Sequence, residues 1–129
     1  MPQEVRRPPR LAPFNADQIM PSLIHAESRG NGTAVSPKGA LGSTQMLPAT
    51  AQAMAAKIGV PYQPGLLQSN DPAALAYQQS LGKAYLQEGF DKTGNTRDAL
   101  RYYHGGPNRA GWGPLTNAYA DGIMGHLKG

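Results

Sequence analysis

One carboxylate stands where a general acid would be useful. Glu27 follows an apolar run that contains Ile19, Leu23 and Ile24, and a glycine-rich stretch begins shortly after it at Gly30. A carboxyl group close to an apolar helix face is partly desolvated, which raises its pKa and holds its proton more tightly. The spacing therefore predicts a general acid near neutral pH. The alternative is an ordinary solvated glutamate at a helix end, because most carboxylates in folded proteins titrate near their usual values.

The sequence offers little for other kinds of catalysis. It has no cysteine, which excludes thiol nucleophiles, disulfides and zinc-thiolate sites. No serine lies in a G-x-S-x-G context, and no P-loop for phosphate is present. His25 and Glu27 are two residues apart, about 200° around a helix, so they do not form a zinc motif. We therefore expect no metal site and no cofactor.

Several ordered motifs are more specific. They are Glu27-Ser28, Ala34-Val35-Ser36-Pro37, Gly39-Ala40-Leu41-Gly42, Gln45-Met46-Leu47-Pro48, Thr50-Ala51, Gly82 with Tyr85-Leu86, and Arg101-Tyr102-Tyr103-His104-Gly105-Gly106-Pro107. In this order the motifs resemble the signature of the soluble lytic transglycosylases, relatives of goose-type lysozyme, from Leu23 to Ile123. The resemblance implies a mainly α, compact lysozyme-like domain with at most a short extended segment near residues 33–36.

The resemblance also implies an activity. These enzymes cut the β-1,4 bond between N-acetylmuramic acid and N-acetylglucosamine in peptidoglycan without hydrolysis, leaving 1,6-anhydro-muramoyl ends. Glu27 would protonate the leaving glycosidic oxygen and then, as a carboxylate, take the proton from the muramoyl C6 hydroxyl. The substrate-binding residues that the match implies are Ser36 near the N-acetyl group, Gln45 as an amide that positions sugar, Tyr103 as the phenol that bonds and orients Glu27, and Leu47, His104 and Tyr119.

Three positions depart from the family pattern. Ser43-Thr44 stand where an apolar leucine-methionine pair is usual, which predicts a smaller and more polar cleft wall. His104-Gly105 replace an asparagine-alanine pair, so a titratable ring takes the place of an amide. Leu115 stands where some members have a glutamate. These changes bear on sugar preference and leave Glu27 in place.

Two other functions remain open at this point. Ordinary glycosidases use two carboxylates, so a hydrolytic muramidase would pair Glu27 with a second acid such as Asp98 or Asp71. A non-catalytic cell-wall-binding domain would keep the cleft and lose turnover.

Caps, helix breakers and apolar spacing predict the elements that position these residues. The predicted helices cover residues 15–28, with Pro21 kinking or restarting the first one, then 48–58, 72–89, 95–105 and 114–127. Glycine and proline place irregular segments at 30–44 and 60–70. In the second helix we expect Leu47 and Ile58 in the core, and in the last helix Leu115, Tyr119, Ile123 and Leu127 facing inward.

Length and charge fit one basic domain. The 129 residues are enough to bury about two-thirds of the surface of the unfolded chain. The net charge of +4 favours an anionic partner. Residues 1–14, rich in arginine and proline, are predicted to be a flexible lead-in, and residues 15–129 a catalytic domain. The segment MPQEVRRPPRLAP has no aromatic residue to stack on bases, so we expect no nucleic acid as a partner. The resemblance to the lytic transglycosylases implies peptidoglycan glycan strands as the partner.

The sequence also suggests a setting. No run approaches the ~18 apolar residues of a membrane span, and the N-terminus lacks the apolar region of a signal peptide. We therefore expect a domain that acts on the extracytoplasmic wall, in the periplasm, as part of a bacteriophage virion or tail or of a larger exported assembly. As an isolated domain it is expected to be a monomer.

Overall fold

The structure is a computed structural model that describes residues 14–128, so most of the predicted lead-in lies outside the described part. Within it, isolated antiparallel bridges pair Leu41 with Val35 and Met46, and no sheet forms. The mainly α fold with a short extended segment is thus confirmed. The elements in chain order are α1 (Ala16–Ser28), α2 (Pro48–Ile58), η2 (Pro64–Leu67), α3 (Pro72–Thr93), α4 (Thr96–Gly105), η3 (Arg109–Gly111) and α5 (Pro114–Lys128).

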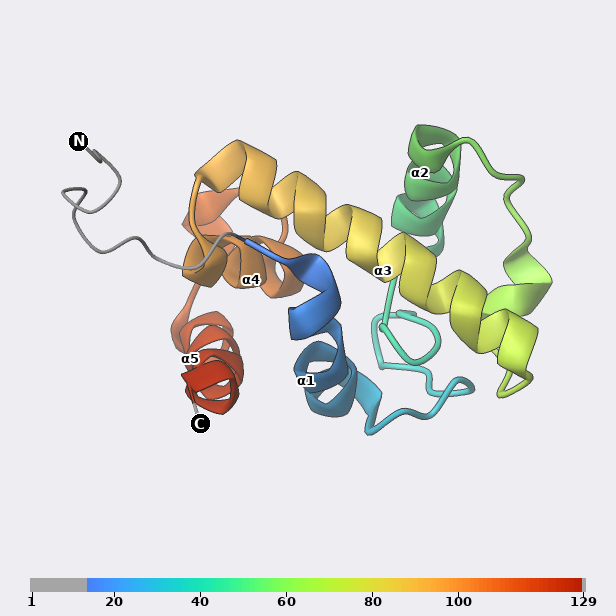
Figure 1. Ribbon diagram of the computed structural model, residues 1–129, viewed down its shortest axis with the longest axis horizontal. Helices are drawn as coiled ribbons and strands as arrows, with labels where there is room; N and C mark the ends of the chain where they lie inside the picture. The colour runs from blue at the N-terminus through green and yellow to red at the C-terminus, as the bar shows by residue number, and fades with distance from the viewer. Residues whose placement is uncertain (1–13, 129) are drawn as a thin grey trace, which may run out of the picture.

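The longest helix, α3, is the centre of the arrangement. It contacts α1, α2, α4 and η2, whereas α5 contacts α1 and α4. In Figure 1, α2 lies toward one end of α3, while α4 and α5 lie toward the other. The end of α1 and the irregular loop that follows it lie below the middle of α3. This arrangement places residues from α1, α4, α5 and the loop near one another.

The helices begin where the caps predict. The side chain of Asn15 accepts a hydrogen bond from the backbone N–H of Gln18, and that of Asn95 accepts one from the backbone N–H of Asp98. Pro48 begins α2, because proline suits a first helical turn that needs no N–H donor. Pro21 lies inside α1, which continues through it without a break in its assignment.

The end of α3 differs from the prediction. Gly89, expected to stop the helix, is buried inside it, and a Cβ there would lie 3.0 Å from the Ala99 carbonyl oxygen and from Tyr102 Cδ1. Gly89 therefore allows α4 to pack closely on α3. The helix ends four residues later, before Gly94, whose φ of 84° suits a left-handed cap.

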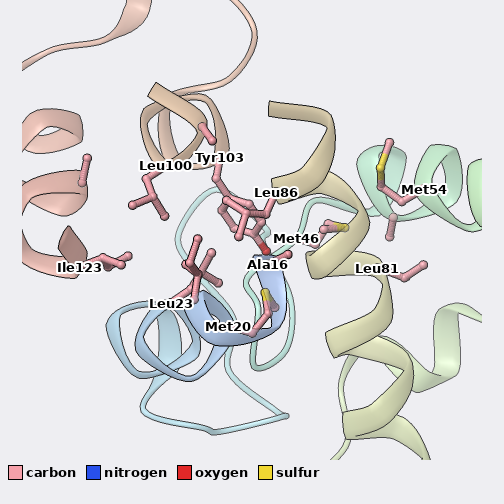
Figure 2. Packing of buried hydrophobic residues seen from close by; sticks show 14 of the residues in the cluster. Ala16, Met20, Leu23, Met46, Met54, Leu81, Leu86, Leu100, Tyr103 and Ile123 are labelled. Carbon is pink, nitrogen blue, oxygen red and sulfur yellow. The ribbon is translucent and has the colours of Figure 1, made fainter. Parts of the chain in front are cut away.

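The core joins all five helices, and Figure 2 shows its side chains converging between them. Leu23 from α1, Leu86 from α3 and Leu100 from α4 are fully buried. Met46 from the loop and Tyr103 from α4 belong to the same cluster. The loop is thus anchored to the hydrophobic core.

Four residues expected in the interior are exposed, and those predictions are wrong. Leu115 is 80% exposed, and Leu47, Ile58 and Leu127 are each more than one-third exposed. Leu47 is the N-cap of α2, and the others lie in a first or last helical turn. Apolar residues at helical spacing are buried only where another element covers that face of the helix, and no element in the described part of the chain covers these four residues at the helix ends.

Candidate active site

Glu27 lies in the last turn of α1. It continues the stripe of Ile19 and Leu23, because residues four apart share one helix face. Burial raises the pKa of Glu27 from 4.5 to about 7, and the nearby Tyr119 phenol offsets part of the rise. The desolvation predicted from the sequence is confirmed, and this carboxyl group keeps a large fraction of its protons at neutral pH.

Two buried phenols lie close to Glu27, one from Tyr103 of α4 and one from Tyr119 of α5. Burial, followed by the negative charge of Glu27, raises the pKa of both phenols well above the usual value. Both hydroxyls therefore remain protonated and keep a proton that can be donated.

The two phenols differ in their partners. Tyr103 Oη donates to the backbone carbonyl of Thr44 at 2.8 Å, so the predicted bond from Tyr103 to Glu27 is wrong. The single hydroxyl proton is used on a buried carbonyl that needs a donor. Tyr119 is the phenol turned toward Glu27. Its buried hydroxyl approaches the carboxyl group, yet it makes no hydrogen bond of normal length within residues 14–128.

The loop after α1 is shaped by its own backbone. Leu41 exchanges hydrogen bonds with Met46 at 3.0 and 3.1 Å. Gly42 has a φ of 81°, and a Cβ there would lie 2.5 Å from the Leu67 carbonyl oxygen. Only glycine fits this position without a shift of the backbone.

Two polar residues predicted to touch sugar are partly engaged within this loop. Ser36 Oγ accepts two backbone N–H bonds from the turn that follows it, which leaves its proton to donate. Gln45 Nε2 donates to the carbonyls of Ala34 and Gly42 at 3.2 and 2.9 Å. Its side-chain oxygen is the atom left for a ligand. The substrate roles of Ser36 and Gln45 stay predictions.

Ser43 and Thr44 are interior residues, each 1% exposed. Ser43 Oγ donates to Gln78 Oε1 at 2.7 Å, and Thr44 Oγ1 donates to the Gln78 carbonyl at 3.3 Å. The prediction that this pair forms a more polar cleft wall is therefore wrong. Both hydroxyls are directed to α3, where they find hydrogen-bond partners.

His104 lies on the outer side of Tyr119, with ring centroids 4.6 Å apart. Its Nδ1 is 2.9 Å from Thr116 Oγ1, so Nε2 is left for a ligand or solvent. Burial, then the positive charge of Lys38, lowers the pKa of His104, so the ring is mainly neutral at pH 7. Leu47 is exposed where the loop meets α2. Contact of His104 and Leu47 with substrate stays a prediction.

Most of the other described carboxylates are bound by other side chains. Asp98, one candidate partner for Glu27, accepts bonds from Asn95 and Arg101 and pairs with Arg109. Asp71, the second candidate, is exposed at the start of α3. The remaining acids lie in these contacts: Asp17 with Lys83, Glu88 with Lys57 and Tyr102, Asp91 with Gln87, and Asp121 with Arg97.

No group of three histidine, aspartate or glutamate side chains that could hold a metal ion occurs in residues 14–128. The helices in this part of the chain are too short or too polar to cross a membrane.

Sequence reasoning missed Gln78, which binds the loop from α3. A signal was available, because Gln78 is four residues from both Ala74 and Gly82 and so shares their buried face. A polar residue on such a face needs partners. Which partners it has depends on the tertiary fold.

Sequence comparison finds a phage relative. The transglycosylase of Enterobacteria phage PRD1 is 33% identical over 118 residues, which are 91% of this chain and 40% of the phage protein. The chain thus spans less than half of that relative.

Solved structures share the fold. The 70 kDa soluble lytic transglycosylase of Escherichia coli superposes with a TM-score of 0.71 at 23% identity, over 85% of this chain and 21% of that one. An inactive glutamate-to-glutamine mutant of the lytic transglycosylase Slt from Pseudomonas aeruginosa gives a TM-score of 0.69 at 21% identity, over 85% and 20%.

The family model of the transglycosylase SLT domain matches residues 13–121, which include Glu27, the loop and both phenols. This protein is a member of the transglycosylase SLT domain family.

Proposed function

We propose that this chain is a peptidoglycan lytic transglycosylase that cuts between N-acetylmuramic acid and N-acetylglucosamine. The observation that carries the proposal is Glu27, a half-buried residue of the family's domain whose carboxyl pKa is raised by burial to about 7. An acid with a pKa near the working pH is well suited to give a proton and then to take one back.

In the first step Glu27 acts as a general acid. Its proton goes to the glycosidic oxygen as the bond from that oxygen to muramoyl C1 breaks. The sugar's own N-acetyl group stabilises the positive charge at C1, so the protein need not supply a second carboxylate. The Ser36 hydroxyl proton is available to donate to this N-acetyl group.

In the second step the same side chain acts as a base. The Glu27 carboxylate removes the proton from the C6 hydroxyl while O6 bonds to C1, which closes the 1,6-anhydro ring. Tyr119, whose buried hydroxyl has no bond of normal length among the described residues, supports the charged form of Glu27 at this stage. The enzyme returns to its starting protonation state.

The alternative of a hydrolytic muramidase is not supported by a second carboxylate that acts on Glu27 in the part of the chain that the structure describes. A hydrolase that inverts or retains configuration uses a second carboxylate near the reacting carbon. Asp98 is bound by two arginines, and Asp71 is exposed as the N-cap of α3. No other carboxylate in the described residues perturbs the pKa of Glu27.

The proposal is tested by Glu27→Gln, which keeps the shape of the side chain and removes its acid. We expect clearing of purified sacculi to fall by at least about a thousandfold, since general acid catalysis and its return step both depend on this group. Binding to sacculi and the circular dichroism spectrum should remain as in the wild type. Substantial residual clearing by a folded Glu27→Gln variant would contradict the proposal.

We also propose that the chain acts on the wall from outside the cytoplasm, as part of a bacteriophage virion or of an exported assembly. The relative from Enterobacteria phage PRD1 supports a phage setting. Mass spectrometry of purified virions should detect the protein. Its occurrence only in uninfected cells would contradict the phage setting.

A further inference from the structure

We propose that Gln78 is a positioning residue for Glu27, acting through the Ser43-Thr44 segment. The inference rests on the proposed function for its catalytic meaning. Its structural content is that one buried amide on α3 fixes the loop segment that is bonded to Ser28, the residue after Glu27, and to Tyr103.

The Gln78 side chain is saturated with hydrogen bonds. It is 1% exposed. Its oxygen accepts from the backbone N–H and the hydroxyl of Ser43 at 2.8 and 2.7 Å. Its nitrogen donates to the carbonyls of Gly32, Leu66 and Ser69 at 3.2, 3.0 and 3.1 Å. One amide thus joins three segments that have little regular secondary structure.

The Ser43-Thr44 segment connects Gln78 to the residues around Glu27. The Ser43 carbonyl accepts a bond of 2.7 Å from the hydroxyl of Ser28, the residue after Glu27. The Thr44 carbonyl accepts the bond of 2.8 Å from Tyr103. The segment held by Gln78 therefore holds the end of α1 and one of the two phenols beside Glu27.

The Ser43-Thr44 segment packs closely against α3. A Cβ on Gly42 would lie 2.8 Å from Gln78 Cδ, and one on Gly82 would lie 2.8 Å from Thr44 Cγ2. The loop lies directly on α3 at both points. If the amide is lost, five polar groups lose their bond to Gln78, and those at Ser43 and Gly32 are buried, so the segment must move to let water reach them.

Movement of this segment would change the surroundings of Glu27. Tyr103 from α4 and Tyr119 from α5 are the titratable groups that face the carboxyl group, and no charged side chain in the described residues perturbs its pKa. Burial is the largest influence on the pKa of Glu27. Water entering beside Ser43-Thr44 would therefore lower that pKa toward its ordinary value.

The test compares Gln78→Met with Gln79→Met. Methionine has a similar length and no amide, and Gln79 is the neighbouring, exposed residue of the same helix. The pKa of Glu27 is measured by NMR titration of the ¹³C-labelled carboxyl group, which does not require turnover. We expect Gln78→Met to lower the pKa of Glu27 by about one unit, a tenfold change in proton affinity. The pH at which sacculus clearing declines should move down with that pKa. Gln79→Met should leave both unchanged.

Folded Gln78→Met protein in which Glu27 titrates as in the wild type would overturn the inference. If Gln78→Met does not fold, Ser43→Ala decides, because it removes one bond to Gln78 and keeps the backbone bond. A fall in the pKa of Glu27 supports the inference, and an unchanged value overturns it. Failure of the proposed function would look different: wild-type protein would titrate near pH 7 and respond to Gln78→Met, yet release no product from sacculi.

Discussion

At the scale of single residues, Glu27 links catalysis to stability. Because its pKa is about 7 in the folded protein and 4.5 ordinarily, the folded state binds its proton more tightly. The stabilisation is therefore complete below pH 4.5 and is lost as the pH rises through about 7. At pH 8 the folded protein carries a buried negative charge that costs on the order of 3 kcal/mol.

This linkage gives a first prediction. Glu27→Gln should raise the free energy of unfolding at pH 8 by up to about 3 kcal/mol and change it little at pH 4. Urea denaturation at both pH values measures the difference.

Glu88 provides the control for this prediction, because its pKa is lowered in the folded state. Burial would raise that pKa, and the bonds from Tyr102 and Lys57 outweigh the effect. The stability that Glu88 contributes is thus present above pH 4.5 and lost in acid, so Glu88→Gln should destabilise the protein at pH 8. Equal effects of the two substitutions at pH 8 would contradict the account of Glu27.

The two phenols give a second prediction, because the same substitution removes different interactions. Tyr103→Phe leaves the buried Thr44 carbonyl without its donor and should cost about 1–3 kcal/mol of stability. Tyr119→Phe removes a hydroxyl that has no bond of normal length, so stability should stay the same or rise.

Tyr119→Phe should instead raise the pKa of Glu27, because the phenol lowers it in the wild type. The pH at which clearing activity declines would then move upward. Thermal melts and pH profiles of both variants separate the two roles. A larger loss of stability from Tyr119→Phe than from Tyr103→Phe would show that the roles are exchanged.

At the scale of the elements, the loop depends on how closely it lies against α3. A Cβ on Gly82 would lie 2.8 Å from Thr44 Cγ2 and 3.1 Å from Met20 Cε. Gly82→Ala should therefore destabilise the protein by about 1–3 kcal/mol, even though alanine favours helices. Gly122→Ala in α5 meets no atom within 4 Å and should stabilise it by about 0.5–1 kcal/mol. Chemical denaturation of the two variants measures the contrast, and effects of the same sign would refute it.

The sequence predicted the helices because their signals are local. Asn15 and Asn95 cap their helices through residues three positions away, and Pro48 and Pro72 begin theirs. The errors arise where tertiary contacts decide. Gly89 resembles a helix stop until α4 is placed against it.

For the candidate site, too, the sequence predicted the features that depend on local signals and missed those that depend on tertiary contacts. The position of Glu27 beside an apolar stripe indicated a raised pKa. The partner of Tyr103 and the role of Ser43 were not predictable in this way. These contacts join residues 59 and 35 positions apart, so they follow from the fold and from no local pattern.

At the scale of the whole molecule, this domain is one part of larger proteins among its relatives. It matches 40% of the phage PRD1 transglycosylase and about one-fifth of each bacterial structure. The described residues hold Glu27, both phenols and the loop within one core. We therefore expect residues 14–128 to carry the chemistry.

The product of digestion tests the central claim most directly. Purified sacculi digested with the wild-type protein should release muropeptides with 1,6-anhydro-muramoyl ends, each lighter by the mass of one water than the corresponding hydrolysis product. Glu27→Gln should release neither. Liquid chromatography with mass spectrometry distinguishes the two products, and reducing muramoyl ends formed by the wild-type protein would contradict the claim that one carboxyl group serves as acid and then base.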